Sequence, residues 1–78
     1  MKFRVYVSFR TGILDPEAEA IKKTIKNIGY DQVENLSRGK FFNIEVKKGT
    51  KNPNKVINKI SDEILSNPIV EKFKIEKE

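Results

Sequence analysis

The sequence predicts an α+β fold in which two helices cover one face of a mostly antiparallel sheet. Apolar and polar residues alternate near both ends of the chain, and two internal stretches place apolar residues three and four positions apart. Alternation is typical of half-buried strands, and the wider spacing is typical of amphipathic helices. The 78 residues are expected to form a single domain, residues 1–78.

Residues 2–10 are expected to form the first strand. Its alternating apolar side chains are Phe3, Val5, Val7 and Phe9. Successive side chains of a strand point to opposite faces, so one face would be buried and the other would meet water or a partner. Tyr6 belongs to this second face.

The first helix is expected to begin at Asp15-Pro16. Aspartate accepts backbone N–H bonds at a helix N-cap, and the fixed φ of proline suits the first helical residue. The apolar stripe that follows consists of Ala18, Ile21, Ile25 and Ile28. Gly29 suits the left-handed residue that follows a helix end, so the helix should stop there.

The middle of the chain is predicted to contain two strands, 32–37 and 40–48. Three of its apolar residues share one face of a strand: Phe42, Ile44 and Val46. Val33 and Leu36 lie three residues apart, so one regular strand cannot bury all five. One unbroken strand would also span about 50 Å, more than twice the usual length. A turn is therefore expected at Gly39, and one bent strand is the alternative.

A second helix is expected after Asn52-Pro53, which again combines a cap with a first-turn proline. Its apolar stripe consists of Val56, Ile57, Ile60, Ile64 and Leu65. Asn67-Pro68 should end it.

The last residues alternate Phe73 and Ile75 with charged side chains, as in an edge strand protected by charge. The order is therefore β-α-β-β-α-β, which is that of a ferredoxin-like sandwich. One sheet face would stay uncovered, and on it Tyr6 and Phe41 are the candidate residues of an oligomer interface. The alternative is that both are isolated exposed aromatic side chains.

The composition excludes most catalytic sites. The chain has neither histidine nor cysteine, so it lacks a thiolate nucleophile, the commonest general base and the usual zinc ligands. Asp15, Glu17 and Glu19 are not expected to bind a metal, because residues two apart on a helix do not face each other. No catalytic residue, metal site or bound cofactor is predicted.

The charge pattern favours a solvated surface over a nucleic-acid site. The 16 basic residues are interleaved with 11 acidic ones, although the net charge is +5. The segment RGKFFNIEV resembles an RNA-recognition strand, but Lys40 and Glu45 stand where that motif needs aromatic rings. Weak RNA binding through a basic face is the alternative. No apolar run approaches a membrane span, so no membrane contact and a cytoplasmic location are expected.

Five stretches of the chain occur in a characteristic order: KFRVYV, GILDP, IGY, GKFFNIEV and LSNPIVEKFKIE. Together they resemble the PurS subunit family of phosphoribosylformylglycinamidine synthase over nearly the whole chain. The resemblance implies a noncatalytic homodimer or homotetramer that bridges a PurQ-type glutaminase subunit and a PurL-type synthetase subunit. It implies a supporting role in ammonia transfer during de novo purine biosynthesis. ATP and magnesium would be used by the synthetase subunit of this glutamine-dependent ligase, not by this chain.

The positions that match the family's motifs are Gly12, Leu14, Asp15, Pro16, Gly29, Tyr30, Gly39, Lys40, Asn67 and Pro68. The family usually has arginine two places before the turn glycine, whereas this chain has Ser37 there and its arginine is Arg38. One step along a strand changes the face to which a side chain points.

Asp15-Pro16 is expected to fix the shape of the preceding loop, so that Gly12, Ile13 and Leu14 contact a partner subunit. The alternative for Leu14 is a hydrophobic staple packed on the helix. Arg38 and Lys40 are further candidates, able to bind an anion or a partner carboxylate, and simple solvent exposure is their alternative. A second class of function is a ferredoxin-like, ACT-type domain that senses a small ligand at a dimer interface.

Overall fold

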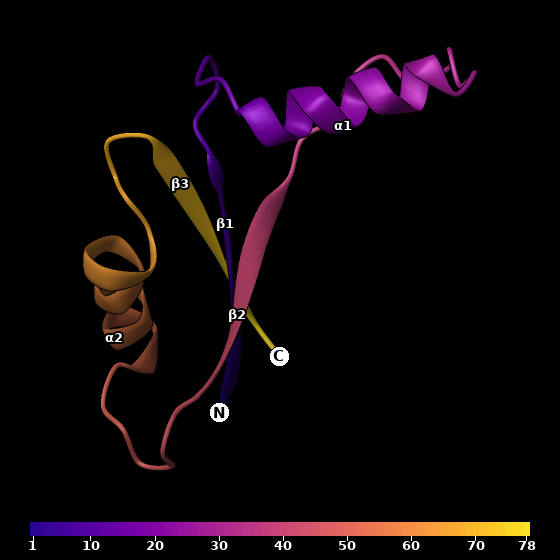
Figure 1. The fold of residues 1–78 in the computed structure, drawn as a ribbon. Coiled ribbons are helices and arrows are strands. Elements are labelled where there is room, and N and C mark those ends of the chain that lie inside the picture. Colours follow the sequence, from indigo (N-terminus) through magenta and orange to yellow (C-terminus); the bar gives the residue numbers. More distant parts are fainter.

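The structure is a computed structural model that describes residues 1–78. Its elements, in order, are β1 (Lys2–Phe9), α1 (Pro16–Asn27), β2 (Gly39–Glu45), α2 (Pro53–Ile60), a π-helical turn η1 (Ser61–Leu65) and β3 (Glu71–Lys77) (Figure 1). The predicted α+β class is confirmed. Both helices begin at a proline, as the sequence indicated.

The sheet has three strands in the order β2-β1-β3, and both neighbouring pairs are antiparallel. Val5 lies opposite Phe42 on one side and Ile75 on the other. Tyr6, the next residue, lies opposite Phe41 and Lys74. The register therefore separates an inner apolar face from an outer face that carries aromatic and charged side chains.

The core lies between the inner face and α2, which covers the sheet from that side (Figure 1). Its fully buried members are Phe3, Val5, Val7 and Ile57. Buried Ser61 continues the helix into η1, and its hydroxyl donates to the carbonyl of Ile57 at 2.7 Å. The flanking strands are only half covered, because Phe42, Ile44, Phe73 and Ile75 are partly buried around this centre.

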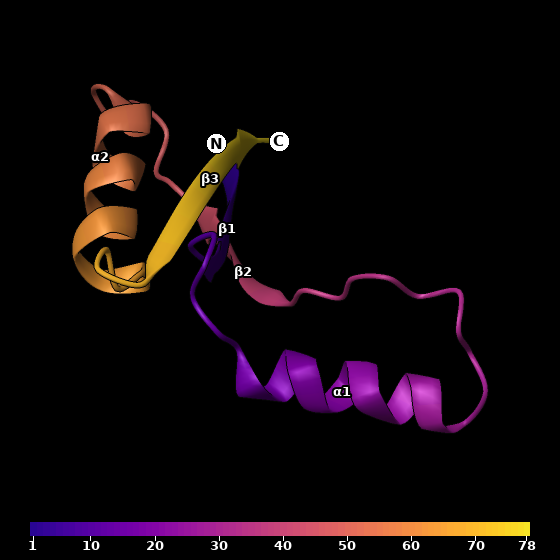
Figure 2. The ribbon, with the colours of Figure 1, turned by 90° about the horizontal axis from the view of Figure 1, so that it is seen from above.

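The position of α1 differs from the prediction that both helices cover one face. Helix α1 lies beyond the end of the sheet and points away from it (Figures 1 and 2). Ile21 and Ile28 of its apolar stripe are 45% and 67% exposed. The radius of gyration is 16.2 Å, whereas a compact domain of this length would have about 11–12 Å. The chain is therefore extended, with one helix packed on the sheet and one not.

The predicted strand 32–37 is absent, and β2 runs from Gly39 to Glu45 rather than over 40–48. None of the backbone hydrogen bonds outside helices and strands involves residues 31–38. The pairing of β1 with β2 ends at Ser8 opposite Gly39, so no strand lies beside the earlier segment to receive its bonds. The segment enters β2 without a hairpin (Figure 1).

Candidate functional site at the base of the arm

Residues 13–38 form a projection that we call the arm. It consists of the loop before α1, α1 itself and a return segment that leads into β2 (Figure 2). Both limbs meet the sheet at the same end, where β1 stops at Phe9 and β2 starts at Gly39. The geometry of this base determines in which direction α1 points.

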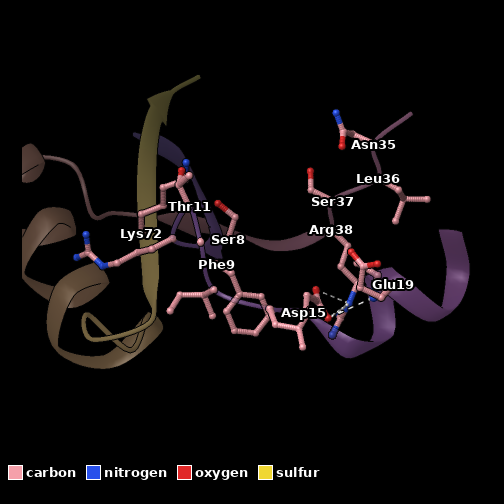
Figure 3. Close-up of a pocket in the computed structure, with 15 residues that line it drawn as sticks. Ser8, Phe9, Thr11, Asp15, Glu19, Asn35, Leu36, Ser37, Arg38 and Lys72 are labelled. Atoms are coloured by element: carbon pink, nitrogen blue, oxygen red, sulfur yellow. Dashed lines mark hydrogen bonds and ion pairs between the residues drawn. The ribbon is translucent and has the colours of Figure 1, made fainter. Parts of the chain in front are cut away.

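A groove of about 510 Å³ lies between the base of the arm and the end of the sheet (Figure 3). Ser8 and Phe9 line it from β1, Glu19 from α1, and Leu36 from the return segment. No group of three or more acidic, histidine or cysteine side chains in the chain could hold a metal ion. The groove is lined by β1, α1, β3 and the return segment, and it presents both polar and apolar atoms.

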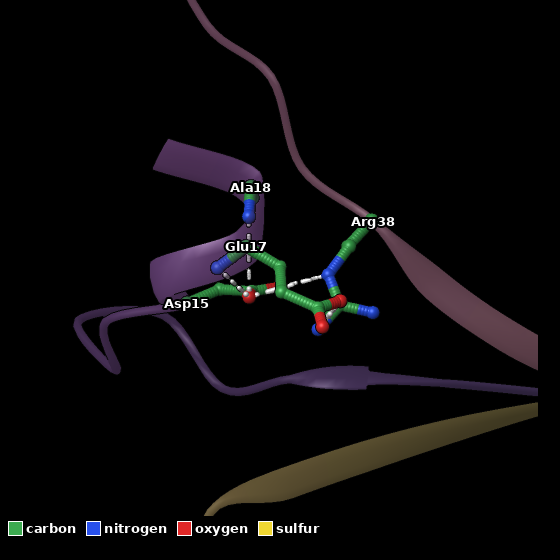
Figure 4. Close-up of polar contacts among 4 residues, drawn as sticks. All are labelled: Asp15, Glu17, Ala18 and Arg38. Atoms are coloured by element: carbon green, nitrogen blue, oxygen red, sulfur yellow. Dashed lines mark hydrogen bonds and ion pairs between the residues drawn. The ribbon is translucent and has the colours of Figure 1, made fainter. Parts of the chain in front are cut away.

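Asp15 caps α1 as the sequence predicted. Its Oδ1 accepts the backbone N–H of Glu17 at 3.1 Å and of Ala18 at 3.3 Å (Figure 4). These bonds satisfy two of the N–H groups that a helix start leaves without partners. Ala18, which donates the second of these bonds, is the buried residue of α1.

Arg38 joins the two limbs of the arm. Its Nε lies 3.0 Å from Asp15 Oδ2, and its Nη2 lies 2.8 Å from Glu17 Oε2 (Figure 4). The side chain of Asp15 is only 10% exposed, so this pair is less screened than an ordinary surface ion pair. The guanidinium thereby ties the return segment to the start of α1. A role of Arg38 toward a partner subunit stays a prediction.

Two substitutions at Asp15 separate the cap from the ion pair. Asp15→Ala removes both and is expected to lower the free energy of unfolding by about 1–2 kcal/mol. Asp15→Asn keeps an oxygen that can cap the helix but loses the charge, so it should retain most of the stability. Urea denaturation followed by circular dichroism measures both values. Equal losses for the two variants would show that the charge, not the cap, matters.

The predicted partner-binding residues lie beside this base. Gly12 has φ +88°, a left-handed conformation that favours glycine. Ile13 is exposed, and Leu14 is 70% exposed. A staple would require Leu14 to pack on the residue at N4, which is Glu19, so this alternative does not hold. Lys40 is exposed, and its Nζ lies 5.8 Å from the centre of the Phe42 ring.

The outer face of the sheet forms a second candidate surface. Tyr6 and Phe41 are exposed and have ring centroids 6.0 Å apart. The Arg4 guanidinium carbon lies 4.8 Å from the centre of the Phe41 ring, and Arg4 Nε donates to Asn43 Oδ1 at 2.9 Å. Tyr6, and then the carboxylate of Glu78, raise the pKa of Arg4, so this side chain stays charged. The alternation of side chains along β1 is enough to place Arg4 on this face. Its contact with Phe41 follows only from the pairing of β1 with β2.

Comparison with known proteins decides the family. The sequence model of the family described as "PurS: Phosphoribosylformylglycinamidine (FGAM) synthase" matches residues 2–78. The chain belongs to the PurS family. Curated members include the Phosphoribosylformylglycinamidine synthase subunit PurS of Bacillus subtilis, 25% identical over 77 residues, which are 99% of this chain and 92% of the relative. The subunit PurS of Archaeoglobus fulgidus is 29% identical over 91% of this chain and 90% of its own length.

Solved structures of PurS proteins share the fold. Bacillus subtilis PurS superposes with a TM-score of 0.88 at 24% identity, covering 96% of this chain and 94% of the other. A chain in the structure of PurLQS from Thermotoga maritima superposes with a TM-score of 0.86 at 29% identity, covering 96% and 93%. The projecting arm is included in this agreement, because nearly all of the chain is covered. Neither helix has the length and apolar character that crossing a membrane requires.

Proposed function

We propose that this chain is the noncatalytic small subunit of phosphoribosylformylglycinamidine synthase, bridging the glutaminase and the ATP-dependent synthetase subunits. The observation that carries the proposal is the match to a chain of the PurLQS structure over 96% of this chain. A bridge needs separate surfaces for separate partners. The exposed loop with Ile13 and Leu14 and the outer sheet face with Tyr6 and Phe41 offer two.

The proposed chemistry takes place in the partner subunits. The glutaminase releases ammonia from glutamine, and the synthetase uses ATP and magnesium to build the amidine in purine biosynthesis. This chain contributes binding surfaces and supports the transfer of ammonia. Its sequence offers no thiolate or imidazole for the reaction. A homo-oligomer and a location in the cytoplasm belong to the same proposal.

The alternative of a small-ligand sensor of the ACT type is not favoured, because the PurS model covers residues 2–78. The RNA-binding alternative also lacks support. Arg4, the cation nearest the exposed aromatic rings, is already engaged by Asn43 and by Glu78 at 3.2 Å.

Reconstitution tests the proposed function. The chain is mixed with purified glutaminase and synthetase subunits, and amidine formation is measured with glutamine or with ammonium as nitrogen donor. Omitting the chain is expected to abolish the glutamine-dependent rate and to leave the ammonium-dependent rate nearly unchanged, because only the former needs the assembled complex. Equal glutamine-dependent rates with and without the chain would contradict the proposal.

A further inference from the structure

The net charge of the chain arises in one segment. Residues 46–61, which we call the basic segment, contain no acidic residue and five lysines, namely Lys47, Lys48, Lys51, Lys55 and Lys59. The remaining 11 of the 16 basic residues equal the 11 acidic residues in number. The interleaving of opposite charges therefore holds outside the basic segment, and the whole excess of +5 lies within it.

The fold leaves these five lysines exposed and without acidic partners. All five are exposed, and the cations in the ion pairs of the chain are Arg4, Arg38 and Lys74. The first turn of α2 has no acidic side chain. The nearest acidic residues along the chain, Glu45 and Asp62, lie just outside the segment, at the end of β2 and in η1. The charge of the basic segment is therefore not neutralised by an ion pair within the chain.

The turn between β2 and α2 holds the first lysines close together. The backbone N–H and the hydroxyl of Thr50 both donate to the carbonyl of Lys47, at 3.3 and 2.7 Å. Gly49 lies between them with φ +83°, the left-handed conformation that a turn of this type requires. The ends of such a turn lie within about 7 Å of each other, less than the screening length of about 8 Å at physiological salt. The charges of Lys47, Lys48 and the following Lys51 therefore act together on an approaching protein.

The other two lysines lie on the outward side of α2. Lys55 and Lys59 are four residues apart, so they are neighbours on the helix surface. Ile57, midway between them, is buried against the sheet, and residues two apart point to roughly opposite sides of a helix. The two lysines therefore face away from the sheet. The turn before α2 lies at the end of the molecule opposite to α1, and both views separate α2 from the arm (Figures 1 and 2).

We propose that the basic segment is a docking surface for a carboxylate-rich surface of a partner subunit of the complex. This inference rests on the proposed bridging function and gives the bridge a further surface. That surface is separate from the loop of Ile13 and Leu14 and from the outer sheet face with Tyr6 and Phe41. Opposite charges steer the encounter of two proteins and raise the rate of association. An acidic partner supplies the negative charge that the chain itself does not place here.

The composition of the basic segment favours protein carboxylates over nucleic acid. It contains no aromatic residue on which a base could stack and no arginine that could bind a phosphate through two hydrogen bonds. Lysine is a hydrated point charge on a flexible stem, which suits carboxylates spread over a protein surface. None of the five lysines lines the groove at the base of the arm. They are spread over a turn and a helix face, as a broad docking surface requires.

Charge reversal tests the docking surface. Lys51→Glu and Lys55→Glu are combined in the basic-segment variant. Lys23→Glu and Lys26→Glu, at exposed positions of α1, form a control with the same change of net charge. The glutaminase and synthetase subunits are immobilised separately, and the association rate of the full chain is measured at several salt concentrations.

We expect the wild type to bind one of the two subunits, and to bind it faster as the salt concentration falls. The basic-segment variant should associate about tenfold more slowly at low salt and should depend less on salt. The difference should shrink at about 1 M salt, where the screening length is only about 3 Å. The control should keep the rate and the salt dependence of the wild type.

The basic-segment variant is expected to stay folded. Lys55 is the third residue of α2, where an acidic side chain is favoured by the positive end of the helix dipole. Lys51 is exposed and precedes the helix. Melting curves followed by circular dichroism check that slower association does not come from unfolding.

Wild-type rates in the basic-segment variant, or equal slowing in the control, would overturn the docking surface. A changed mass in light scattering would instead assign the segment to contacts between copies of this chain. Loss of binding to a single-stranded RNA oligonucleotide, with unchanged binding to both subunits, would assign it to nucleic acid. In these cases the wild type still binds the subunits, so the bridging function stands. A wild type that binds neither subunit would reject the bridging function together with the docking surface.

Discussion

Ile57→Ala is expected to lower the free energy of unfolding by about 3–4 kcal/mol, which is a large part of the stability of a domain this small. Ile57 is completely buried and is the side chain of α2 that closes the core against Phe3, Val5 and Val7. Few other apolar side chains are fully buried, so little of the remaining core can compensate. Chemical denaturation of the purified protein measures the loss.

Val56→Ala provides the control for this core variant. Val56 precedes Ile57 on the same helix but is 39% exposed. Its replacement by alanine therefore removes far less buried apolar surface than the replacement of Ile57. A decrease of about 1 kcal/mol or less is expected. Similar losses at both positions would mean that α2 does not pack on the sheet through Ile57.

Gly39→Ala is expected to lower the free energy of unfolding by about 2 kcal/mol. It should also loosen the pairing of β1 with β2 at the end where Ser8 lies opposite Gly39. A Cβ on Gly39 would lie 2.5 Å from the carbonyl oxygen of Val7, a backbone atom that cannot move without disturbing the sheet. Faster amide exchange in the β1–β2 ladder, together with a lower unfolding midpoint, is the expected measurement.

Ser37→Ala serves as the comparison for Gly39→Ala. Ser37 is exposed and lies outside the sheet, so its replacement is expected to change stability by less than about 0.5 kcal/mol. Unchanged amide exchange in Gly39→Ala would contradict the close approach of the two strands. Gly39 was predicted to be structural as a turn residue, but its observed role is to allow this contact at the start of β2.

Most elements could be predicted from local patterns in the sequence. Alternation identified β1 and β3, and the cap-proline pairs identified the starts of both helices. These signals are local, because the capping oxygen of Asp15 and the N–H groups it accepts lie within three residues. The same pattern showed that Tyr6 and Phe41 share the uncovered face, as the register confirms.

The direction of the arm could not be predicted, because no local pattern states which surface an apolar stripe covers. The stripe of α1 is equally consistent with packing on its own sheet or on that of another chain. The segment 32–37 was expected to form a strand, but it pairs with no strand of the sheet. The ion pairs of Arg38 with Asp15 and Glu17 join residues distant in sequence, and the sequence offers no signal for them.

The slab-like dimensions of the protein, 53 × 25 × 14 Å between Cα atoms, have an electrical consequence. The screening length at physiological salt is about 8 Å, so charges on opposite broad sides, which lie further apart than this, are largely screened from one another. Proteins bound on opposite sides would therefore associate nearly independently at that salt. Their mutual electrostatic influence should grow only as the buffer is diluted.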